Sequence, residues 1–135
     1  MKHLILFMLL VFICFRPTVA CVKNRVLIQN DLGIGRNLEL HCSSKHNDLG
    51  IQTLNYKFSY IIKFHEELYS ATKWNCSFRQ GTHLEYYYDV EVYNEGDRLF
   101  PRCGQLRVWT TRIDGIYFTR KLSIPSVLAL RWKKI

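Results

Sequence analysis

The chain has 135 residues, of which 48% are hydrophobic and 22% are charged, and its formal net charge is +8 at pH 7. This length corresponds to one domain preceded by a short leader. Beyond the leader no apolar run reaches the roughly 20 residues that a transmembrane helix needs, so the sequence excludes a membrane-spanning protein.

The N-terminus has the pattern of a signal peptide. A lysine precedes an unbroken apolar run, residues 4–15, which is shorter than a transmembrane helix and has the length of a signal-peptide core. A buried core helix is the alternative, but such a helix would show a polar face, and this run has none. Small residues at positions 18–20 predict cleavage after Ala20. We therefore expect a signal peptide over residues 1–20 and one secreted, extracellular domain over residues 21–135.

The cysteine count fits a disulfide framework in this secreted domain. Cys14 lies in the leader, and four cysteines remain after cleavage, the even number that two bridges need. These are Cys21, Cys42, Cys76 and Cys103. Cleavage also removes two basic residues and no acidic one, which leaves a net charge of +6.

Hydrophobic alternation predicts strands from the start of the domain. Residues 22–29 are rich in β-branched and aliphatic side chains, and the glycines and Asn-Asp pair of residues 30–35 favour a hairpin turn into a second strand. In that strand, residues 38–43, apolar side chains alternate with polar ones and Cys42 shares the apolar face. The polar run over residues 44–50 then predicts a surface loop.

The same alternation continues through the middle of the chain. It predicts strands with one buried face over residues 58–64, 73–79 and 84–93, and residues 94–97 form a turn after the last of them. The aromatic and aliphatic side chains expected in the core include Phe58, Ile62, Phe64, Tyr86 and Tyr88.

The C-terminal part of the chain also has strand patterns. Residues 106–113 predict a strand, and Asp114-Gly115 favours a type I′ hairpin turn into residues 116–119. Alternation over residues 127–132 predicts the last strand, with a helix from Ser126 as the alternative. Seven or eight short strands without a long helix predict an all-β fold, a small antiparallel β-sandwich of two sheets stabilised by disulfides.

The histidines do not form a recognisable chemical site. Those that remain after cleavage are His41, His46, His65 and His83, and none has the short spacing to another that zinc sites use. Solvated surface histidines are the better interpretation, so we expect neither a metal nor a cofactor. A basic secreted ribonuclease would use two histidines as general acid and base, but no motif places them together. We therefore expect a protein without enzymatic activity.

Nine basic residues lie within the last 40 residues, which suggests a surface for anionic partners. A solvated polar face explains these charges equally well. Nucleic acid is disfavoured, because alternation places Tyr86 and Tyr88 in the core rather than on a base-stacking surface and because the protein is extracellular. We expect no nucleic-acid partner and, after leader removal, no insertion into membranes.

Asn75-Cys76-Ser77 is a sequon for N-glycosylation. Alternation turns Asn75 away from the buried face of Cys76, so the acceptor amide should lie at the surface. A bridge through Cys76 would compete with glycan transfer, and the sequence leaves the occupancy of Asn75 open.

The order of these motifs resembles the plant self-incompatibility S-protein homologue family over nearly the whole mature chain. The most specific part is Leu40-His41-Cys42-Ser43-Ser44-Lys45 followed by Asp48-Leu49-Gly50. The other matching segments are Val26–Asn30, Trp74–Phe78, Asp89–Tyr93, Arg102-Cys103, Trp109, Asp114-Gly115 and Arg131-Trp132. The resemblance implies a small secreted β-sandwich without catalytic activity. The best-understood members of the family are pistil signalling ligands that bind a receptor on incompatible pollen.

The chain departs from the family pattern at Arg107, where members usually have a cysteine two residues before the matching tryptophan. The resemblance implies one bridge from Cys76 to Cys103 and another from Cys42 to position 107, so Cys42 has lost its partner here. An unpaired cysteine risks exchange in an oxidising compartment. We therefore expect Cys21, at the new N-terminus, to pair with Cys42.

The resemblance predicts a secreted signalling ligand that binds a cell-surface receptor, and we expect it to act as a monomer. Because rigid sandwiches present loops at their ends, we expect two polar connections to bind the partner. Their residues are Ser44, Lys45, His46, Asn47 and Asp48 in the first, and Asn94, Glu95, Asp97 and Arg98 in the second. Ser44 and Asp48 should stabilise the first loop through backbone amides. The alternative is a cationic secreted defence protein acting on microbial membranes.

Overall fold

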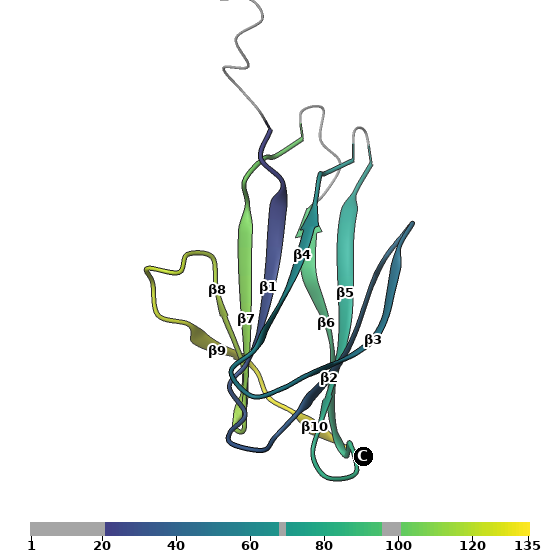
Figure 1. Cartoon of the computed structure of the whole chain (residues 1–135). Helices are drawn as coiled ribbons and strands as arrows, with labels where there is room; N and C mark the ends of the chain where they lie inside the picture. Colours follow the sequence, from purple (N-terminus) through teal and green to yellow (C-terminus); the bar gives the residue numbers. More distant parts are fainter. Residues whose placement is uncertain (1–20, 68–69, 96–100) are drawn as a thin grey trace, which may run out of the picture.

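The computed structural model describes residues 21–67, 70–95 and 101–135, and every regular element in these ranges is a β-strand. Two five-stranded sheets face each other, which confirms the all-β sandwich (Figure 1). The first sheet contains, in spatial order, β4 (Ser59–Phe64), β1 (Asn24–Asn30), β7 (Leu106–Arg112), β8 (Gly115–Thr119) and β9 (Val127–Leu130). The second contains β10 (Lys133–Lys134), β6 (Tyr86–Glu95), β5 (Thr72–Gln80), β2 (Leu38–Ser44) and β3 (Asp48–Leu54). In the described ranges there is no helix with the length and apolarity needed to cross a membrane, and the expected signal peptide lies outside them.

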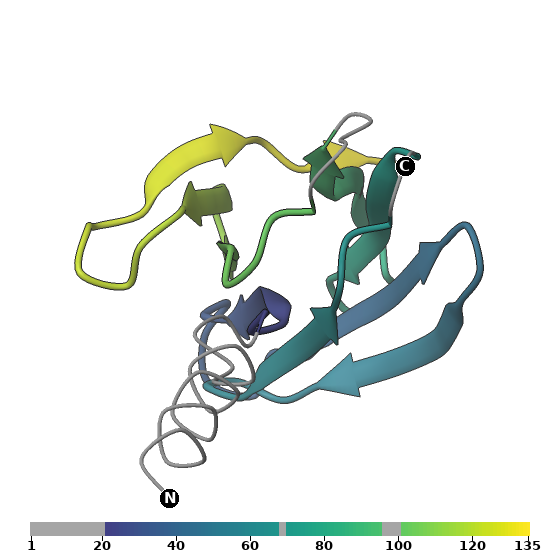
Figure 2. The ribbon, with the colours of Figure 1, turned by 90° about the horizontal axis from the view of Figure 1, so that it is seen from above.

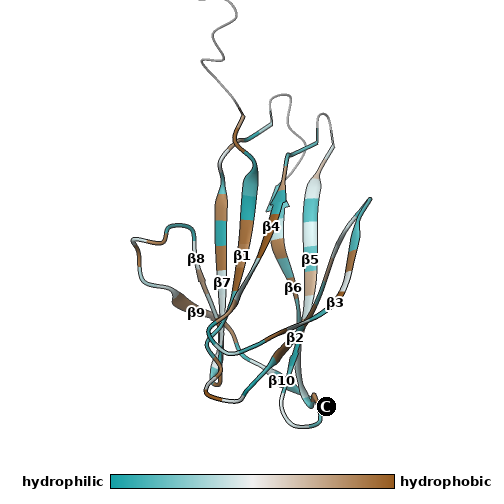
Figure 3. Ribbon diagram, in the orientation of Figure 1, coloured by the Kyte–Doolittle hydropathy of each residue, from teal (hydrophilic) through white to brown (hydrophobic). Residues whose placement is uncertain are grey.

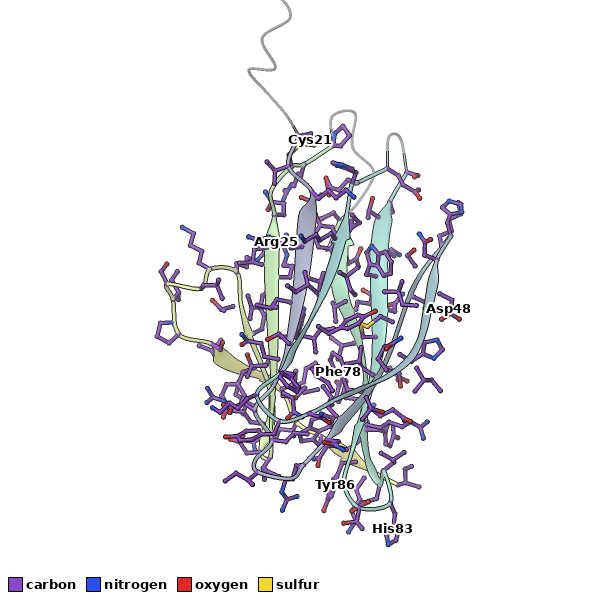
Figure 4. The ribbon with its side chains drawn as sticks, in the orientation of Figure 1. Cys21, Arg25, Asp48, Phe78, His83 and Tyr86 are labelled. Atoms are coloured by element: carbon purple, nitrogen blue, oxygen red, sulfur yellow. A yellow bond between two sulfur atoms is a disulfide. The ribbon has the colours of Figure 1, made fainter. Side chains whose placement is uncertain are left out.

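The hydrophobic core lies between the sheets and is built from the inward-facing positions of the strands. Bands of different hydropathy are visible along β5 (Figure 3), and burial alternates with the two-residue period of a strand along both β1 and β5. Phe78, at the centre of the sandwich in Figure 4, and Tyr93 are among the largest fully buried side chains. The indole N–H of Trp109 in β7 donates a 3.0 Å hydrogen bond to the carbonyl of Val92 in β6. This bond joins the two sheets and satisfies a polar group that burial would otherwise penalise.

Strands β1 and β2 do not form the expected hairpin, because they belong to different sheets. β1 pairs with β4 in an antiparallel and with β7 in a parallel arrangement, so the first sheet is mixed. Asn30, buried at the end of β1, donates hydrogen bonds to the carbonyls of Arg36 (2.9 Å) and Leu54 (2.8 Å) and accepts one from the amide of Leu32 (2.9 Å). These bonds fix the connection between the sheets, which alternation within a strand does not reveal.

Strand β3 lies where the sequence predicted a surface loop. Only Leu54 of its seven residues is buried, because β3 is an edge strand of the second sheet, and its sequence therefore shows no alternation. Between His41 and Ser43 the pairing of β2 with β3 slips by one residue, and Gly50 in the resulting bulge has a φ of 73°. The loop is therefore restricted to residues 45–47.

The chain ends in two short strands of different sheets, instead of one strand over residues 127–132 or a helix from Ser126. β9 pairs with β8, whereas β10 pairs with β6. Trp132 lies in the crossing between them, and its indole N–H donates a 2.7 Å hydrogen bond to the carbonyl of Arg112. This contact joins positions 20 residues apart, so local periodicity could not predict the crossing.

The hairpin between β7 and β8 exists, but its turn differs from the expected type. Arg112 pairs with Gly115, so the two-residue loop is Ile113-Asp114, and neither of these residues has a positive φ. A type I′ turn requires positive φ at both positions. Gly115 is instead needed for space, because a Cβ there would lie 2.5 Å from the carbonyl oxygen of Leu130 and 2.5 Å from Leu128 Cδ1.

We call residues 115–130, which comprise β8, β9 and the loop between them, the β8–β9 arm. Seen from above, the arm extends to one side of the stacked sheets (Figure 2), in agreement with its position in Figure 1. The strand order explains this placement, since β9 is the edge strand of the first sheet and lies two strands beyond β7.

Two aromatic side chains expected in the core, Phe58 and Tyr86, do not belong to it, and a third, Tyr88, packs against the core while partly exposed. Phe58 is 59% exposed, because β4 begins only after it, behind a turn in which Lys57 has a φ of 73°. Tyr86 and Tyr88 are half-buried beside β10, whose Lys134 and Lys133 lie 5.8 and 5.1 Å from the respective ring centres. The tyrosine argument against nucleic acid therefore fails for Tyr86 and holds only in part for Tyr88.

Candidate interaction surface

The four cysteines of the domain form two disulfides, and their pairing differs from the expected one. Cys42 and Cys76 stand opposite each other on neighbouring strands β2 and β5 and are bonded, with Cα atoms 4.0 Å apart. Cys21 is bonded to Cys103, with a Cα separation of 5.1 Å. The expected pairs Cys21–Cys42 and Cys76–Cys103 are wrong, because the sheet register already brings Cys42 and Cys76 within the ~7 Å between Cα atoms that a disulfide can span.

The two disulfides differ in burial and in what they connect. Cys42 and Cys76 belong to the core, whereas Cys21 and Cys103 are exposed at the end of the sandwich where Figure 4 labels Cys21. Around the exposed bridge, Gly104 N–H donates to the carbonyl of Val22 at 2.8 Å. The N-terminal segment is thereby fixed beside the segment that enters β7, and β1 and β7 continue from there in parallel.

Arg107 stands where the family resemblance leads one to expect a cysteine, and it is buried. Its Nη2 donates a 2.9 Å hydrogen bond to Glu95 Oε1, and its guanidinium lies 5.0 Å from the ring centre of Tyr93. Arg102 Nη1 lies 3.4 Å from the same Glu95 oxygen. The ion pair connects β7 of the first sheet with the end of β6 in the second.

A second buried carboxylate, that of Glu66, forms hydrogen bonds at the same end of the sandwich as the Arg107–Glu95 pair. Glu66, 7% exposed, accepts a 3.0 Å hydrogen bond from the Tyr93 hydroxyl and another from the backbone amide of Arg102. Burial, followed by the hydrogen bond to Glu66, raises the pKa of the Tyr93 hydroxyl far above its ordinary value. The hydroxyl therefore remains a donor throughout the physiological pH range, and the connections on either side of β5 and β6 are held together.

The first predicted binding loop is the tip of the β2–β3 hairpin, in which Lys45, His46 and Asn47 are exposed. Ser44 contributes its backbone amide, which donates a 2.7 Å hydrogen bond to the carbonyl of Asn47. His46 Nε2 lies 3.3 Å from Glu67 Oε1, so the tip also contacts the connection between β4 and β5. These exposed contacts position the loop but contribute little to global stability.

Asp48 begins β3 rather than ending a loop, and it lies at the outer edge of the second sheet (Figure 4). Its Oδ1 accepts a 2.9 Å hydrogen bond from the amide of Gly50 and lies 2.5 Å from His41 Nε2. These contacts, the backbone bond first and the histidine second, lower the pKa of the Asp48 carboxyl below its ordinary value. The expected bond from Asp48 to a nearby backbone amide is therefore present, although Gly50 lies in β3 rather than in the loop.

The second predicted binding loop is only partly described. Asn94 and Glu95 are the last residues of β6, and Asp97 and Arg98 lie outside the described residues. The side-chain amide of Asn94 donates a 2.7 Å hydrogen bond to Glu91 Oε2. Glu95 points inward, with its side chain 14% exposed, and is engaged by Arg107. Of this set, Asn94 is exposed and Glu95 is part of the interior ion pair.

Asn75 lies on the outer face of the second sheet and is exposed. It pairs with Ser43 of β2 on one side and with Glu91 of β6 on the other. Its position between two strands places any modification of Asn75 directly over this face.

The described histidines do not converge on a catalytic or metal-binding arrangement. His41 lies beside Asp48 and His46 beside Glu67, whereas His65 Nδ1 lies 3.8 Å from Cys21 Sγ. His83 is in the turn between β5 and β6, at the end of the molecule opposite Cys21 in Figure 4. No group of three potential metal ligands occurs among the residues that the structure describes.

A hollow of about 670 Å³ lies between the β1–β2 connection and the β5–β6 turn. Its lining includes the side chains of Arg36, Glu39, Thr53 and Thr82. These residues supply one charge of each sign but no histidine or cysteine, so we assign the hollow no chemistry.

Exposed apolar side chains gather on the β8–β9 arm, which the sequence did not single out. Leu122, Ile124, Val127 and Leu128 are all exposed large hydrophobic residues. Alternation predicted a strand here but not that β9 would be an edge strand of the first sheet. The sequence does set this segment apart by charge, because the run from Gly115 to the end of the chain contains five basic residues and no acidic one.

Comparisons with known proteins agree with this architecture. The family model for plant self-incompatibility protein S1 matches residues 25–132. S-protein homolog 25 of Arabidopsis thaliana is 49% identical over 135 residues, covering 99% of each chain, and S-protein homolog 30 of the same plant is 52% identical over 130 residues, covering 94% of this chain and 100% of the relative. A solved structure of a self-incompatibility protein homologue, described as one of a widespread family of small, highly stable, secreted proteins from plants, has a TM-score of 0.69 at 34% identity, covering 85% of this chain and 98% of that chain. The chain therefore belongs to the plant self-incompatibility protein S1 family.

Proposed function

We propose that this protein is a secreted, non-enzymatic ligand that binds a receptor protein at the plant cell surface. Membership of the S1 family over nearly the whole chain supports this most directly, together with the secreted solved relative. The fold is suited to the role, because two disulfides and a packed core hold surface side chains in fixed positions and reduce the entropy lost on binding. Catalysis is disfavoured, since the described histidines lie in separate contacts rather than around one cleft.

The proposal includes secretion through a signal peptide over residues 1–20. Cleavage after Ala20 would make Cys21 the first residue of the mature protein. The new N-terminus would then be held by the disulfide between Cys21 and Cys103. Both disulfides would then form in the oxidising secretory pathway. Mass spectrometry of the secreted protein should show an N-terminal peptide that begins at Cys21, and any other start would contradict this cleavage site.

Saturable binding to living cells tests the ligand proposal. Fluorescently labelled protein should bind plant protoplasts saturably, and an excess of unlabelled protein should compete with it. Mild trypsin treatment of the protoplasts should remove the binding if the receptor is a protein. Protein that has been reduced and alkylated serves as the unfolded control. Binding that is non-saturable, or that survives trypsin, would contradict a protein receptor.

A cationic defence protein is the second candidate, and the net charge of +6 over residues 21–135 favours it. Leakage from vesicles rich in phosphatidylglycerol separates the two functions. A receptor ligand should leave such vesicles intact at the concentrations that saturate protoplasts. Release of vesicle contents at those concentrations would favour the defence function instead.

A further inference from the structure

The β8–β9 arm contains a concentration of exposed apolar side chains. Leu122 (66% exposed), Ile124 (52%), Val127 (66%) and Leu128 (38%) fall within seven consecutive residues. Elsewhere in the described chain the exposed large hydrophobic side chains are more widely scattered, as is usual for a protein surface. Because adjacent residues of a strand point to opposite faces, Val127 and Leu128 expose apolar surface on both sides of β9, and exposed apolar surface of this kind is typical of interaction sites. In Figure 3 the hydrophobic colour of β9 is visible at the side of the molecule.

Strand β9 also offers a free backbone edge. It pairs with β8 on one side, and none of the strands in the described residues pairs with its other side. Edge strands usually contain charged residues or prolines that prevent pairing with another chain. The three other edge strands contain such charges, with Lys63 in β4, Asp48 in β3 and two lysines in β10. The sequence of β9, Val-Leu-Ala-Leu, contains none.

Positive charge flanks β9 at both ends. Arg120 and Lys121 lie in the loop before the strand and Arg131 follows it directly, and all three are exposed. Asp114, the nearest acidic residue in the sequence, lies before the arm, and its Oδ2 accepts a 2.5 Å hydrogen bond from the Tyr117 hydroxyl. β9 is therefore an apolar strand with basic residues in the loop before it and directly after it.

We propose that β9 is the docking strand of this protein and that its occupant is an extended segment of a partner protein in which apolar and acidic side chains are combined. The segment would add to the free edge of β9 through backbone hydrogen bonds. Its carboxylates would lie beside Arg120, Lys121 and Arg131, which supply complementary charge. This inference rests on the proposed function, because it names the surface that meets the receptor. It moves the binding surface from the expected loops to the β8–β9 arm.

A second copy of the chain and a lipid surface fit the arm less well. Antiparallel pairing of β9 with β9 would bring Arg131 of each copy to the end of the pair where the other copy's loop with Arg120 and Lys121 enters β9, and like charges at the same end disfavour the pair. An anionic membrane could contact the basic side chains through its headgroups and the apolar side chains through its acyl chains. It cannot supply the regular row of donors and acceptors that the free backbone edge requires. An extended peptide with apolar and acidic side chains would match the exposed apolar residues, the flanking basic residues and the free backbone edge of β9.

Binding of model peptides by fluorescence anisotropy tests the proposal. The probe is a fluorescein-labelled peptide of about eight residues, the length of an ordinary strand, in which valine alternates with glutamate. A peptide with lysine in place of glutamate is the charge control. The folded protein should bind the glutamate peptide and leave the lysine peptide unbound. The double variant Arg120→Glu/Lys121→Glu should reverse this preference.

Substitutions at two edge strands locate the binding. Val127→Asp in β9 should weaken the glutamate peptide by about tenfold or more, since it adds a repelling charge to the docking strand. Ile51→Asp in β3 is the matched control, because Ile51 is 65% exposed and Val127 66%. The control should keep the dissociation constant within about twofold of the original, a difference well below 1.4 kcal/mol. Circular dichroism should show that both variants are folded.

Several outcomes would overturn the inference. They are equal binding of the lysine peptide, no binding of either peptide, and an equal loss in Ile51→Asp and Val127→Asp. Sedimentation that shows a dimer abolished by Val127→Asp would assign the arm to a second copy. Binding to phosphatidylserine vesicles that depends on Val127, without peptide binding, would assign it to lipid.

The protoplast assay separates this inference from the proposed function. If wild type and Val127→Asp bind protoplasts equally, the docking strand is wrong and the ligand function stands. If the wild-type protein shows no saturable binding to protoplasts, the proposed ligand function is wrong, regardless of the result of the peptide-binding experiment.

Discussion

Arg107 and Glu95 form an interior ion pair between the two sheets, with Arg107 Nη2 2.9 Å from Glu95 Oε1 and side-chain exposures of 6% and 14%. Tyr93 packs against the guanidinium, and its hydroxyl donates to Glu66. Charges removed from water are tolerated only when they are paired and hydrogen-bonded. The stability of the folded protein should therefore fall if only one of the two charged side chains is removed.

Replacement of Arg107 by methionine should destabilise the protein strongly. The change would remove the 2.9 Å contact of the Glu95 carboxylate with Arg107, whereas the 3.4 Å contact with Arg102 would stay. Removal of one member of a buried pair costs about 3 kcal/mol of unfolding free energy. Urea denaturation of Arg107→Met and wild type measures the difference.

Two further variants show whether burial is the cause. Lys57→Met removes an ion pair with Asp31 in which the lysine side chain is 69% exposed, and we expect a much smaller loss. The double variant Arg107→Met/Glu95→Met should recover much of the stability, because neither charge of this pair remains to be buried without the other. A double variant as unstable as Arg107→Met alone would contradict this account.

The two disulfides should differ in their rate of reduction. Cys42 and Cys76 are buried in the core, whereas Cys21 and Cys103 are exposed. A phosphine reductant added to the folded protein should therefore cleave Cys21–Cys103 first, because the phosphine must reach a disulfide sulfur to attack it and is itself oxidised to the phosphine oxide as both thiols are released. Alkylation followed by peptide mapping should label this pair while Cys42 and Cys76 stay bonded. Simultaneous labelling of all four cysteines under native conditions would contradict the prediction.

Alternation predicted the strands whose inner faces form the core, because it reports burial along a single segment. β2 and β5 lie within one or two residues of their predicted bounds for this reason. β3 was missed because an edge strand with one buried residue has no period to detect. The strand pattern at the C-terminus was found, but its division into β9 and β10 in different sheets was not, since alternation does not show which strands pair.

Relationships between distant segments could not be predicted in the same way. The Cys42–Cys76 bridge depends on the register of β2 against β5, and Cys21–Cys103 depends on the parallel pairing of β1 with β7. Arg107 was recognised as a departure from the family pattern, but its partner Glu95 was expected in a binding loop. In both cases the contact follows from the sheet topology rather than from local sequence.

Loss of the Asp48 carboxylate should loosen the β2–β3 hairpin more than the whole fold. Asp48→Ala removes the acceptor of the Gly50 amide and the contact with His41. We expect faster hydrogen exchange in residues 43–50 and little change in the global melting temperature, because the site is exposed. Unchanged protection in this segment would leave Asp48 with no structural role.

The same carboxylate makes the hairpin sensitive to acid. Its pKa is lowered in the folded protein, so its contribution is complete above the ordinary value of 3.8 and is lost as the pH falls through the lowered pKa. The amide resonance of Gly50 should therefore titrate with a midpoint below 3.8. A midpoint at or above that value would contradict the hydrogen bond.

Gly115→Ala should displace β9 from β8. The added Cβ would lie 2.5 Å from the carbonyl oxygen of Leu130, which is backbone and cannot move alone. Amide resonances of residues 127–130 should shift, and stability should fall. Gly35→Ala is the control, because Gly35 has a φ of 72° and no atom within 4 Å of the added Cβ. It should cost about 1 kcal/mol through its backbone conformation without moving a neighbouring strand.

Glycosylation of Asn75 should compete with formation of the neighbouring disulfide. Asn75 lies in β5 between β2 and β6, and Cys76 within the sequon is bonded to Cys42. Once this bond has formed, the segment is fixed in the sheet and is no longer free to adopt the conformation that glycan transfer needs. Protein secreted from insect cells should therefore contain a mixture of glycosylated and unmodified chains, which glycosidase treatment converts to one mass.

The two disulfides supply a matched test of this competition. Cys42→Ala frees Cys76 and should raise the glycosylated fraction, whereas Cys21→Ala breaks only the bridge to Cys103 and should leave that fraction unchanged. Ser77→Ala removes the sequon and should abolish the modification. An equal rise in both cysteine variants would mean that general loss of stability, rather than the Cys42–Cys76 bond, limits transfer. Because Asn75 pairs with Ser43 and Glu91, an attached glycan would cover the outer face of the second sheet and leave β9, in the first sheet, accessible.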